Sequence, residues 1–190
     1  MSEAIASGGG ALVRLIERGA EAATVALSQF LSGTALQQGP AQESVLPDLE
    51  TFAIHDMAQA GLGVEVPFIS RPSSTFVILL DQVSAGGFVR RMLGAMTPTA
   101  ALVDSVLLEA GNITACAFGD ALARHTHVPW VPTVPILRRG VLADVVRASA
   151  PEGARVLTAQ FIAAELDLQG RFVWLADLKT VRTLASRLSP

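Results

Sequence analysis

Three polar side chains stand at helical spacing inside the segment SVLLEAGNITAC, residues 105–116. Ser105, Glu109 and Asn112 occupy positions i, i+4 and i+7, so a helix would carry them on one stripe of its surface. A carboxylate can pair with a cation, and an amide can both accept and donate hydrogen bonds. The spacing therefore predicts a rigid helix that presents an ion-pairing group and two hydrogen-bonding groups together.

Gly111 and Asn112 are unexpected inside a helix, because glycine costs about 1 kcal/mol relative to alanine there. We interpret Gly111 as a position without a side chain beside Asn112, where another surface can approach the helix closely. A neighbouring apolar stripe is expected to face the core and to leave the polar trio outside; it consists of Leu102, Val106, Ala110, Ile113 and Ala117. The alternative is a solvated helix surface in which Gly-Asn marks a helix end.

Periodicity and capping signals assign the elements that must position this helix. Residues 1–10 are predicted to be a flexible tail, followed by a single domain over residues 11–190. Helices are expected at 11–31, 48–59, 82–96, 98–124 and 178–188, and strands at 63–70, 74–81, 155–168 and 171–177. Residues 32–47 are expected to form a loop.

Two parts of the chain resemble each other at a nearly constant offset, as in an internal repeat. At an offset of 96 the coinciding pairs are Phe76/Phe172, Val77/Val173, Leu79/Leu175, Asp81/Asp177 and Arg91/Arg187. At an offset of 95 the long helices align, and Pro40 coincides with Pro135. The sequence therefore predicts two pseudo-repeats, about 11–96 and 97–190, each a helix–strand–strand–helix unit, sharing one sheet about a pseudo-two-fold axis. Chance similarity between two amphipathic units is the alternative.

Composition limits the classes of function. The net charge of −3 and the pI of about 5.6 argue against a nucleic-acid-binding protein. The mean hydropathy of +0.46 is high, but no run of 18 uncharged apolar residues suits a membrane span, and no basic segment marks a signal peptide. The single cysteine, Cys116, excludes an internal disulfide and is expected to be a small core residue. These features predict a cytoplasmic protein without membrane insertion.

The polar trio and its surroundings resemble the CheC/CheX/FliY family of chemotaxis phosphatases. The family's signature is Asp or Ser, three residues, Glu, two residues, Asn, and then twenty-two residues before Pro; Ser105, Glu109, Asn112 and Pro135 meet every spacing. The text LLEAGNITACAFGDALA looks like the family's helix, and ATVALSQFLSG is similar to the end of its first helix. The resemblance covers about residues 11–188. It implies an α/β (α+β) fold with one mainly antiparallel sheet and two long helices on one face.

The resemblance also implies a protein-aspartyl-phosphate phosphatase that acts on a CheY-like response regulator, in chemotaxis or another two-component pathway. The regulator would bring its own Mg²⁺ and lysine, so this chain would need no metal or other cofactor of its own. Asn112 would place the attacking water, and Glu109 would pair with the regulator's lysine. Ser105, Gly111 and Pro135 would be supporting residues at the contact.

The first half departs from this pattern. Arg14 and Glu17 stand where Glu109 and Asn112 stand in the second half, so a cation replaces the acid and a carboxylate replaces the amide. One working site is therefore expected, in the second half, beside a degenerate first site. The alternative is a catalytically weak adaptor that binds a response regulator, the receptor deamidase CheD or flagellar switch proteins.

Other candidate groups carry weaker signals. His125 and His127 form an HxH pair without an evident third ligand, so we expect surface or packing histidines and no metal site. The arginine pairs at 90–91 and 138–139 are expected to be solvated, although either could dock an acidic partner.

Overall fold

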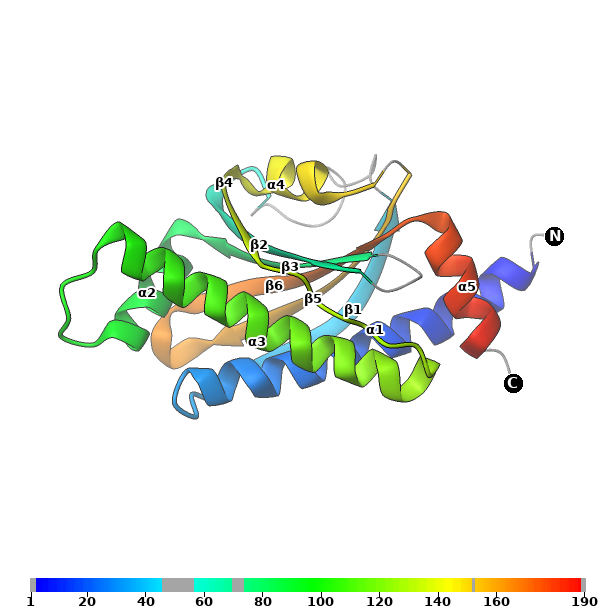
Figure 1. The fold of residues 1–190 in the computed structure, drawn as a ribbon, viewed down its shortest axis with the longest axis horizontal. Helices are drawn as coiled ribbons and strands as arrows, with labels where there is room; N and C mark the ends of the chain where they lie inside the picture. Colours follow the sequence, from blue (N-terminus) through cyan, green and yellow to red (C-terminus); the bar gives the residue numbers. More distant parts are fainter. Residues whose placement is uncertain (1–2, 46–56, 70–73, 152, 189–190) are drawn as a thin grey trace.

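The computed structural model describes residues 3–45, 57–69, 74–151 and 153–188 (Figure 1). In chain order, this part of the protein contains α1 (Glu3–Phe30), β1 (Gln37–Val45), β2 (Ala60–Phe68), β3 (Ser74–Asp81), α2 (Gln82–Leu93), α3 (Ala100–Thr126), β4 (Ile136–Val141), α4 (Leu142–Ser149), β5 (Arg155–Ala163), β6 (Leu168–Ala176) and α5 (Leu178–Leu188). A short 3-10 turn, Ala164–Leu166, joins β5 to β6.

The strands form one antiparallel sheet in the order β1-β5-β6-β3-β2-β4. This order is symmetric: if β1 is matched with β4, β2 with β5 and β3 with β6, the strand order is the same when counted from either edge of the sheet. At its centre Val77 of β3 lies opposite Val173 of β6, and these two residues are a pair at the sequence offset of 96. The edge strand of each half pairs with a strand of the other half. β1 of the first half pairs with β5 of the second, and β4 of the second half pairs with β2 of the first. The predicted fold class, a mixed α/β fold with one antiparallel sheet, is confirmed.

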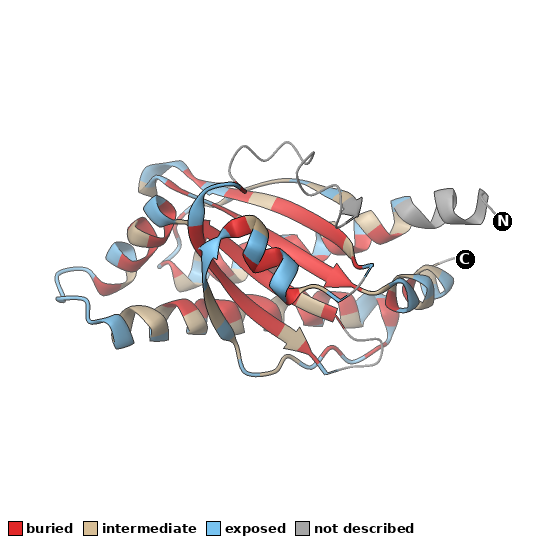
Figure 2. Cartoon of the chain, turned by 90° about the horizontal axis from the view of Figure 1, so that it is seen from above, coloured by how far each residue is buried: buried red, intermediate tan, exposed pale blue. Residues whose placement is uncertain are grey.

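The two long helices, α1 and α3, lie side by side on one face of the sheet (Figure 1). Helix α4 lies on the opposite face, as the view from above shows (Figure 2). Successive side chains of β3 point to opposite faces of the sheet, so this strand contributes to the cores on both faces. Phe76, Ile78 and Leu80 belong to the core beneath α1 and α3, whereas Val77 and Leu79 belong to the smaller core beneath α4. The sheet is therefore held between two apolar layers.

Two matched aspartates begin the helices that follow the central strands. Asp81 accepts a hydrogen bond from the backbone N–H of Ser84, at 2.7 Å, and Asp177 accepts one from Thr180, at 2.6 Å. Each carboxylate satisfies an N–H group that the first turn of a helix leaves unpaired. The aspartate pair is thus explained by helix capping.

Residues 3–10 continue helix α1, where the sequence analysis expected a flexible tail. This stretch contains three consecutive glycines, at positions 8–10. Extension of an existing helix adds one hydrogen bond per residue, and this gain offsets the conformational cost of the glycines.

The sequence analysis missed both edge strands. β1 falls in the segment expected to be a loop, and β4 follows the proline-rich segment. An edge strand pairs on one side only, so it tolerates proline and polar side chains that hide its periodicity. The helix expected at 48–59 lies mostly outside the described residues.

Within the described residues, α3 is the one helix whose length and apolar composition would suffice to cross a membrane. In this fold it is a core helix, because Leu107, Ala110, Ala115, Phe118 and Leu122 pack beneath it against the rest of the protein. Its apolar character therefore serves the core.

Candidate functional site

The predicted site residues gather along one exposed edge of α3. Ser105 and Glu109 are exposed and Asn112 is half-buried. They border an open groove of about 750 Å³ between the helix and the segment 132–135. The groove is lined by Ala101, Asp104, Ser105, Leu108, Glu109, Asn112, Pro132, Thr133, Val134 and Pro135. The sequence spacing thus brings Ser105, Glu109, Asn112 and Pro135 to a single surface.

Gly111 does not belong to that surface, and its predicted role is wrong. The residue is buried and faces the sheet, where a Cβ atom would come within 2.3 Å of Val64 Cγ1 on β2. The missing side chain lets α3 lie close to β2, and it does not open the helix to a partner. Gly111 therefore fixes the height of the helix above the sheet and positions its neighbour Asn112 at the helix edge.

The apolar stripe expected to face the core is also misplaced. The buried face of α3 comprises Leu107, Ala110, Gly111, Thr114, Ala115, Phe118, Gly119, Ala121, Leu122 and Thr126. Of the predicted stripe, only Ala110 is buried; Leu102, Val106, Ile113 and Ala117 are half-buried. The helix is rotated about its axis relative to the prediction, but the polar trio still reaches solvent.

The far wall of the groove is fastened to the end of β2. The backbone N–H of Thr133 donates to the carbonyl of Pro67 at 2.8 Å, and the N–H of Ile69 donates to the carbonyl of Val131 at 3.0 Å. These bonds hold the segment 132–135 in an extended course beside α3. Pro135 therefore shapes the groove through its place in a fixed backbone.

Trp130 anchors the start of this wall. Its indole N–H donates to Thr126 Oγ1 at 3.2 Å, and its ring packs edge-on against Phe68 at 5.8 Å between centroids. Gly119 makes room for it, because a Cβ atom there would lie 3.0 Å from the Trp130 carbonyl oxygen and 3.1 Å from its Cβ. A buried aromatic thus locates the groove wall relative to the helix.

Charges around the groove are partly neutralised within the chain. Asp104, on the helix beside the trio, pairs with Arg139 of β4. On the opposite face of the sheet, away from the groove, Arg138 pairs with Glu65, whose carboxylate also accepts a hydrogen bond from Ser149 of α4 at 3.0 Å. The arginine pair at 138–139, expected to be solvated, therefore makes two intramolecular ion pairs. Sequence reasoning missed Asp104, which lies one residue before Ser105.

Cys116 is exposed on the same edge of α3, which corrects its expected place in the core. Its Sγ lies 4.0 Å from Oδ1 of Asn112. Burial of part of the side chain raises the pKa of the thiol above its ordinary 9.0, and the carboxylates of Asp120 and Glu109 raise it further. A thiol that keeps its proton at neutral pH is a poor nucleophile. The stripe of Ser105, Glu109 and Asn112 continues to Cys116 at helical spacing, a signal that could have revealed its exposure.

The matching place in the first half looks different. Arg14 is exposed on α1, whereas Glu17 is half-buried and turned toward β1. The Glu17 Oε1 atom accepts a hydrogen bond from the backbone N–H of Ala41 at 3.4 Å, directly after Pro40. The carboxylate of Glu17 therefore ties α1 to the edge strand, in the place where Asn112 faces an open groove.

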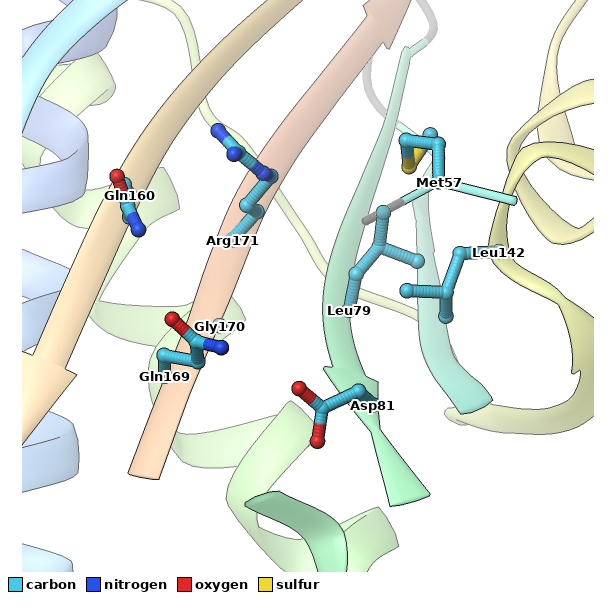
Figure 3. A pocket seen from close by; sticks show the side chains of 8 residues that line it. All are labelled: Met57, Leu79, Asp81, Leu142, Gln160, Gln169, Gly170 and Arg171. Carbon is cyan, nitrogen blue, oxygen red and sulfur yellow. The ribbon is translucent and has the colours of Figure 1, made fainter. Parts of the chain in front are cut away.

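A smaller cavity of about 20 Å³ lies on the opposite face of the sheet (Figure 3). Met57, Leu79 and Leu142 form its apolar side, and Figure 3 shows Asp81 and Arg171 at its polar side. Its volume suits a single water molecule and no larger ligand. Asp81 is already engaged as a helix cap, so this cavity is not the functional site.

The two histidines of the HxH motif point to different surroundings. The ring of His125 lies against the guanidinium of Arg18, with Nε2 at 3.2 Å from Nη1. His127 adopts a left-handed backbone conformation and ends α3, its N–H donating to the carbonyl of Ala123.

Comparison with known proteins relates this geometry to chemotaxis and flagellar proteins. Neither models of protein families nor sequences of curated proteins match the chain. Among solved structures, FliY from Thermotoga maritima matches with a TM-score of 0.71 and 13% identity, over 96% of both chains. A chain of the CheX–CheY–BeF3–Mg²⁺ complex from Borrelia burgdorferi matches with a TM-score of 0.57 and 16% identity, over 86% of this chain and 97% of that one.

A third solved structure has the same fold. A chain of the FliG–FliM complex from H. pylori matches with a TM-score of 0.62 and 12% identity, over 95% of this chain and 98% of that one. At these identities the matches establish a common fold. This chain therefore has the fold of FliY and CheX that its sequence motif implied.

Proposed function

We propose that this chain is a phosphatase for the phospho-aspartate of a CheY-like response regulator in chemotaxis signalling. One observation carries the proposal. The Glu109 carboxylate and the Asn112 amide lie on the same edge of α3 and line one groove together with Pro135. The fold that this chain shares with CheX, found in a complex with CheY, supports a partner of this class.

Asn112 would supply the group that positions the attacking water. Its Oδ1 accepts a hydrogen bond from the water, and its amide N–H donates to a phosphoryl oxygen. The water oxygen attacks phosphorus, and the bond between phosphorus and the aspartyl oxygen breaks. Inorganic phosphate and a free aspartate carboxylate result. An acyl phosphate is already activated, so positioning provides most of the catalysis, and the Mg²⁺ that neutralises the phosphoryl charge would be held by the regulator.

Glu109 would set the register of docking by pairing with a lysine of the regulator. Its side chain is exposed, and no cation among the described residues forms an ion pair with it. Asp104, by contrast, is already paired with Arg139. Ser105 adds a hydroxyl at the same edge. Glu109 is therefore the acid at this surface that remains for a partner.

Apolar side chains border the proposed contact. Val134, on the groove wall, is 82% exposed, and Val131 and Ile136 beside it are 48% and 43% exposed. A cluster of exposed aliphatic side chains is typical of a protein-docking surface. The regulator would cover this rim as its phosphoryl group approaches Asn112.

The test is phosphate release from a phosphorylated CheY-like regulator of the same organism. Wild type should accelerate release, and Asn112→Ala should lower the rate about 100-fold while regulator binding persists, because a misplaced water costs about that factor. Arg14→Ala, an exposed change in the first half, serves as the matched control and should retain the wild-type rate. Equal rates for wild type and Asn112→Ala would contradict the proposal.

An adaptor without catalysis is the second candidate. The fold shared with a chain of the FliG–FliM complex and the exposed rim at Val134 support binding to switch proteins. CheD is the other partner that the resemblance of the motif implies. Such an adaptor would bind a regulator without changing its rate of phosphate release, and Asn112→Ala would have no effect. Either role would place the protein in the cytoplasm with its regulator.

A further inference from the structure

A second groove lies where α1, the C-terminal end of α3 and α5 meet (Figure 1). Its volume is about 210 Å³. It is lined by Ala11, Arg14, Leu15, Arg18, His125 and Leu188. Two arginines and a histidine thus converge over an apolar floor, at a distance from the α3 groove that contains Asn112.

The cations of this groove have no acidic counterpart within the described residues. Arg14 and Arg18 are both exposed, and neither forms an ion pair there. The Arg18 guanidinium lies against the His125 ring, at 3.2 Å from Nε2 and 3.4 Å from Nδ1. Glu17, the nearest acid after Arg14 in sequence, is turned away toward Ala41. The two arginines are therefore not held in ion pairs within the described residues, although the exposed Glu21 lies three residues after Arg18 on the same helix.

Helix α5 adds to this positive charge. Lys179, Arg182 and Arg187 are exposed on it, and the helix contains no acidic residue. Arg187 donates to the carbonyl of Thr126 at 3.4 Å, which places it at the end of α3 near the groove. Clustered charges of one sign raise the local concentration of a partner of the opposite sign.

The fold itself does not require Arg18 and His125 at these positions. At the sequence offset of 95, Ile113 corresponds to Arg18 and Phe30 corresponds to His125. Both apolar counterparts are half-buried, and Phe30 stacks on Phe88 at 6.2 Å between centroids. The positions equivalent to Arg18 and His125 are thus apolar in the other half, whereas the position equivalent to Arg14 is the exposed Glu109. Arg18 and His125 thus stand at positions where the other half places apolar packing side chains.

We propose that the groove of Arg14, Arg18 and His125 docks an acidic segment of a partner protein. The two arginines are four residues apart on α1, so they lie on one face about one helical turn apart. Carboxylates at similar spacing could pair with both, while Leu15 and Leu188 accept apolar side chains between them. A nucleic acid is disfavoured because the whole chain carries a net charge of −3.

Fluorescence anisotropy with a labelled helical peptide tests the proposal. The peptide carries glutamates at i and i+4 flanked by leucines, and a matched peptide carries glutamines in their place. Wild type should bind the acidic peptide, more weakly at high salt, and should not bind the glutamine peptide. Arg14→Ala/Arg18→Ala should bind about tenfold more weakly, since each exposed charge pair contributes modestly. Arg90→Ala, an exposed arginine on α2, is the matched control and should bind like wild type.

Several results would overturn the proposal. Equal binding of both peptides, or equal loss in Arg90→Ala, would show that the groove is not responsible. Tighter binding of duplex DNA would indicate a polyanion site, and full competition by inorganic phosphate would indicate a small-anion site. Circular dichroism confirms the fold of each variant, and Arg18→Gln substitutes for any variant that fails to fold. Phosphate release should be unchanged in the double arginine variant, so this proposal and the phosphatase proposal fail separately.

Discussion

The two long helices occupy equivalent places on the sheet, but their exposed side chains differ in charge and in use. Glu109 on α3 corresponds to Arg14 on α1, and Asn112 corresponds to Glu17. Asn112 lines an open groove, whereas Glu17 accepts a hydrogen bond from Ala41 on the edge strand. The same position on the scaffold thus lines an open groove in one half and ties the helix to an edge strand in the other.

Contacts that hold the helix ends are common to both halves. Arg91 of α2 donates to the carbonyl of Leu31 at the end of α1, and Arg187 of α5 donates to the carbonyl of Thr126 at the end of α3, both at 3.4 Å. Cations suit helix C-termini, where carbonyl groups lack partners. The comparison shows that capping and buried positions carry the fold, while exposed positions on the same helices differ without disturbing it.

Exchanging the charges of the two halves should have the largest effect on the rate of phosphate release. Glu109→Arg places the side chain of the first half at the proposed docking position, and kcat/KM for phosphate release should fall at least about 100-fold through lost pairing and added repulsion. The reciprocal Arg14→Glu should stay within about twofold of wild type, because it lies outside the α3 groove. Initial rates over a range of regulator concentrations measure both. A large loss in Arg14→Glu together with an active Glu109→Arg would reverse the assignment of the working half.

Gly111→Ala separates the two interpretations of that glycine. A Cβ atom at 2.3 Å from Val64 Cγ1 must displace the helix or the strand, so the free energy of unfolding should fall by about 1–3 kcal/mol. Urea denaturation followed by circular dichroism measures the change. Gly86→Ala on α2 is the matched control, because its Cβ would meet only the flexible end of Arg90, at 3.3 Å. Unchanged stability with lost regulator binding would restore the original interpretation of Gly111 as a contact position.

The smallest expected effect concerns Cys116. Its rate of alkylation by iodoacetamide should rise with pH through a midpoint above 9.0, because burial and neighbouring carboxylates oppose the thiolate. Asp120→Asn should lower this midpoint, and Glu109→Gln should lower it by less, since each removes a negative charge. The matching position on α1 has no thiol, so the reaction reports on the α3 edge alone. A midpoint below 9.0 would contradict the described surroundings of Cys116.

The sequence could predict that the candidate site residues share one surface, because their spacing depends only on helix geometry. Ser105, Glu109 and Asn112 lie on one surface of a helix whatever packs beneath them. The central strands could also be predicted, because they carry apolar side chains on both faces. The face of α3 that packs against the sheet was harder to predict, because apolar residues lie on most sides of that helix. Periodicity alone could not choose between the stripe of Ile113 and the stripe that includes Gly111. The close approach of Gly111 to Val64 determines which stripe is buried, and that contact depends on tertiary structure.

The exchanged edge strands set the order in which this protein can be completed during synthesis. Glu43 of β1 and Arg155 of β5 form an ion pair across 112 positions of sequence. While the ribosome makes the second half, β1 has no strand to pair with and exposes its backbone groups. The sheet can close only after β5 has emerged, so folding should be slow and late for the length of the chain. A chaperone that shields β1 during this interval would protect the nascent chain from aggregation.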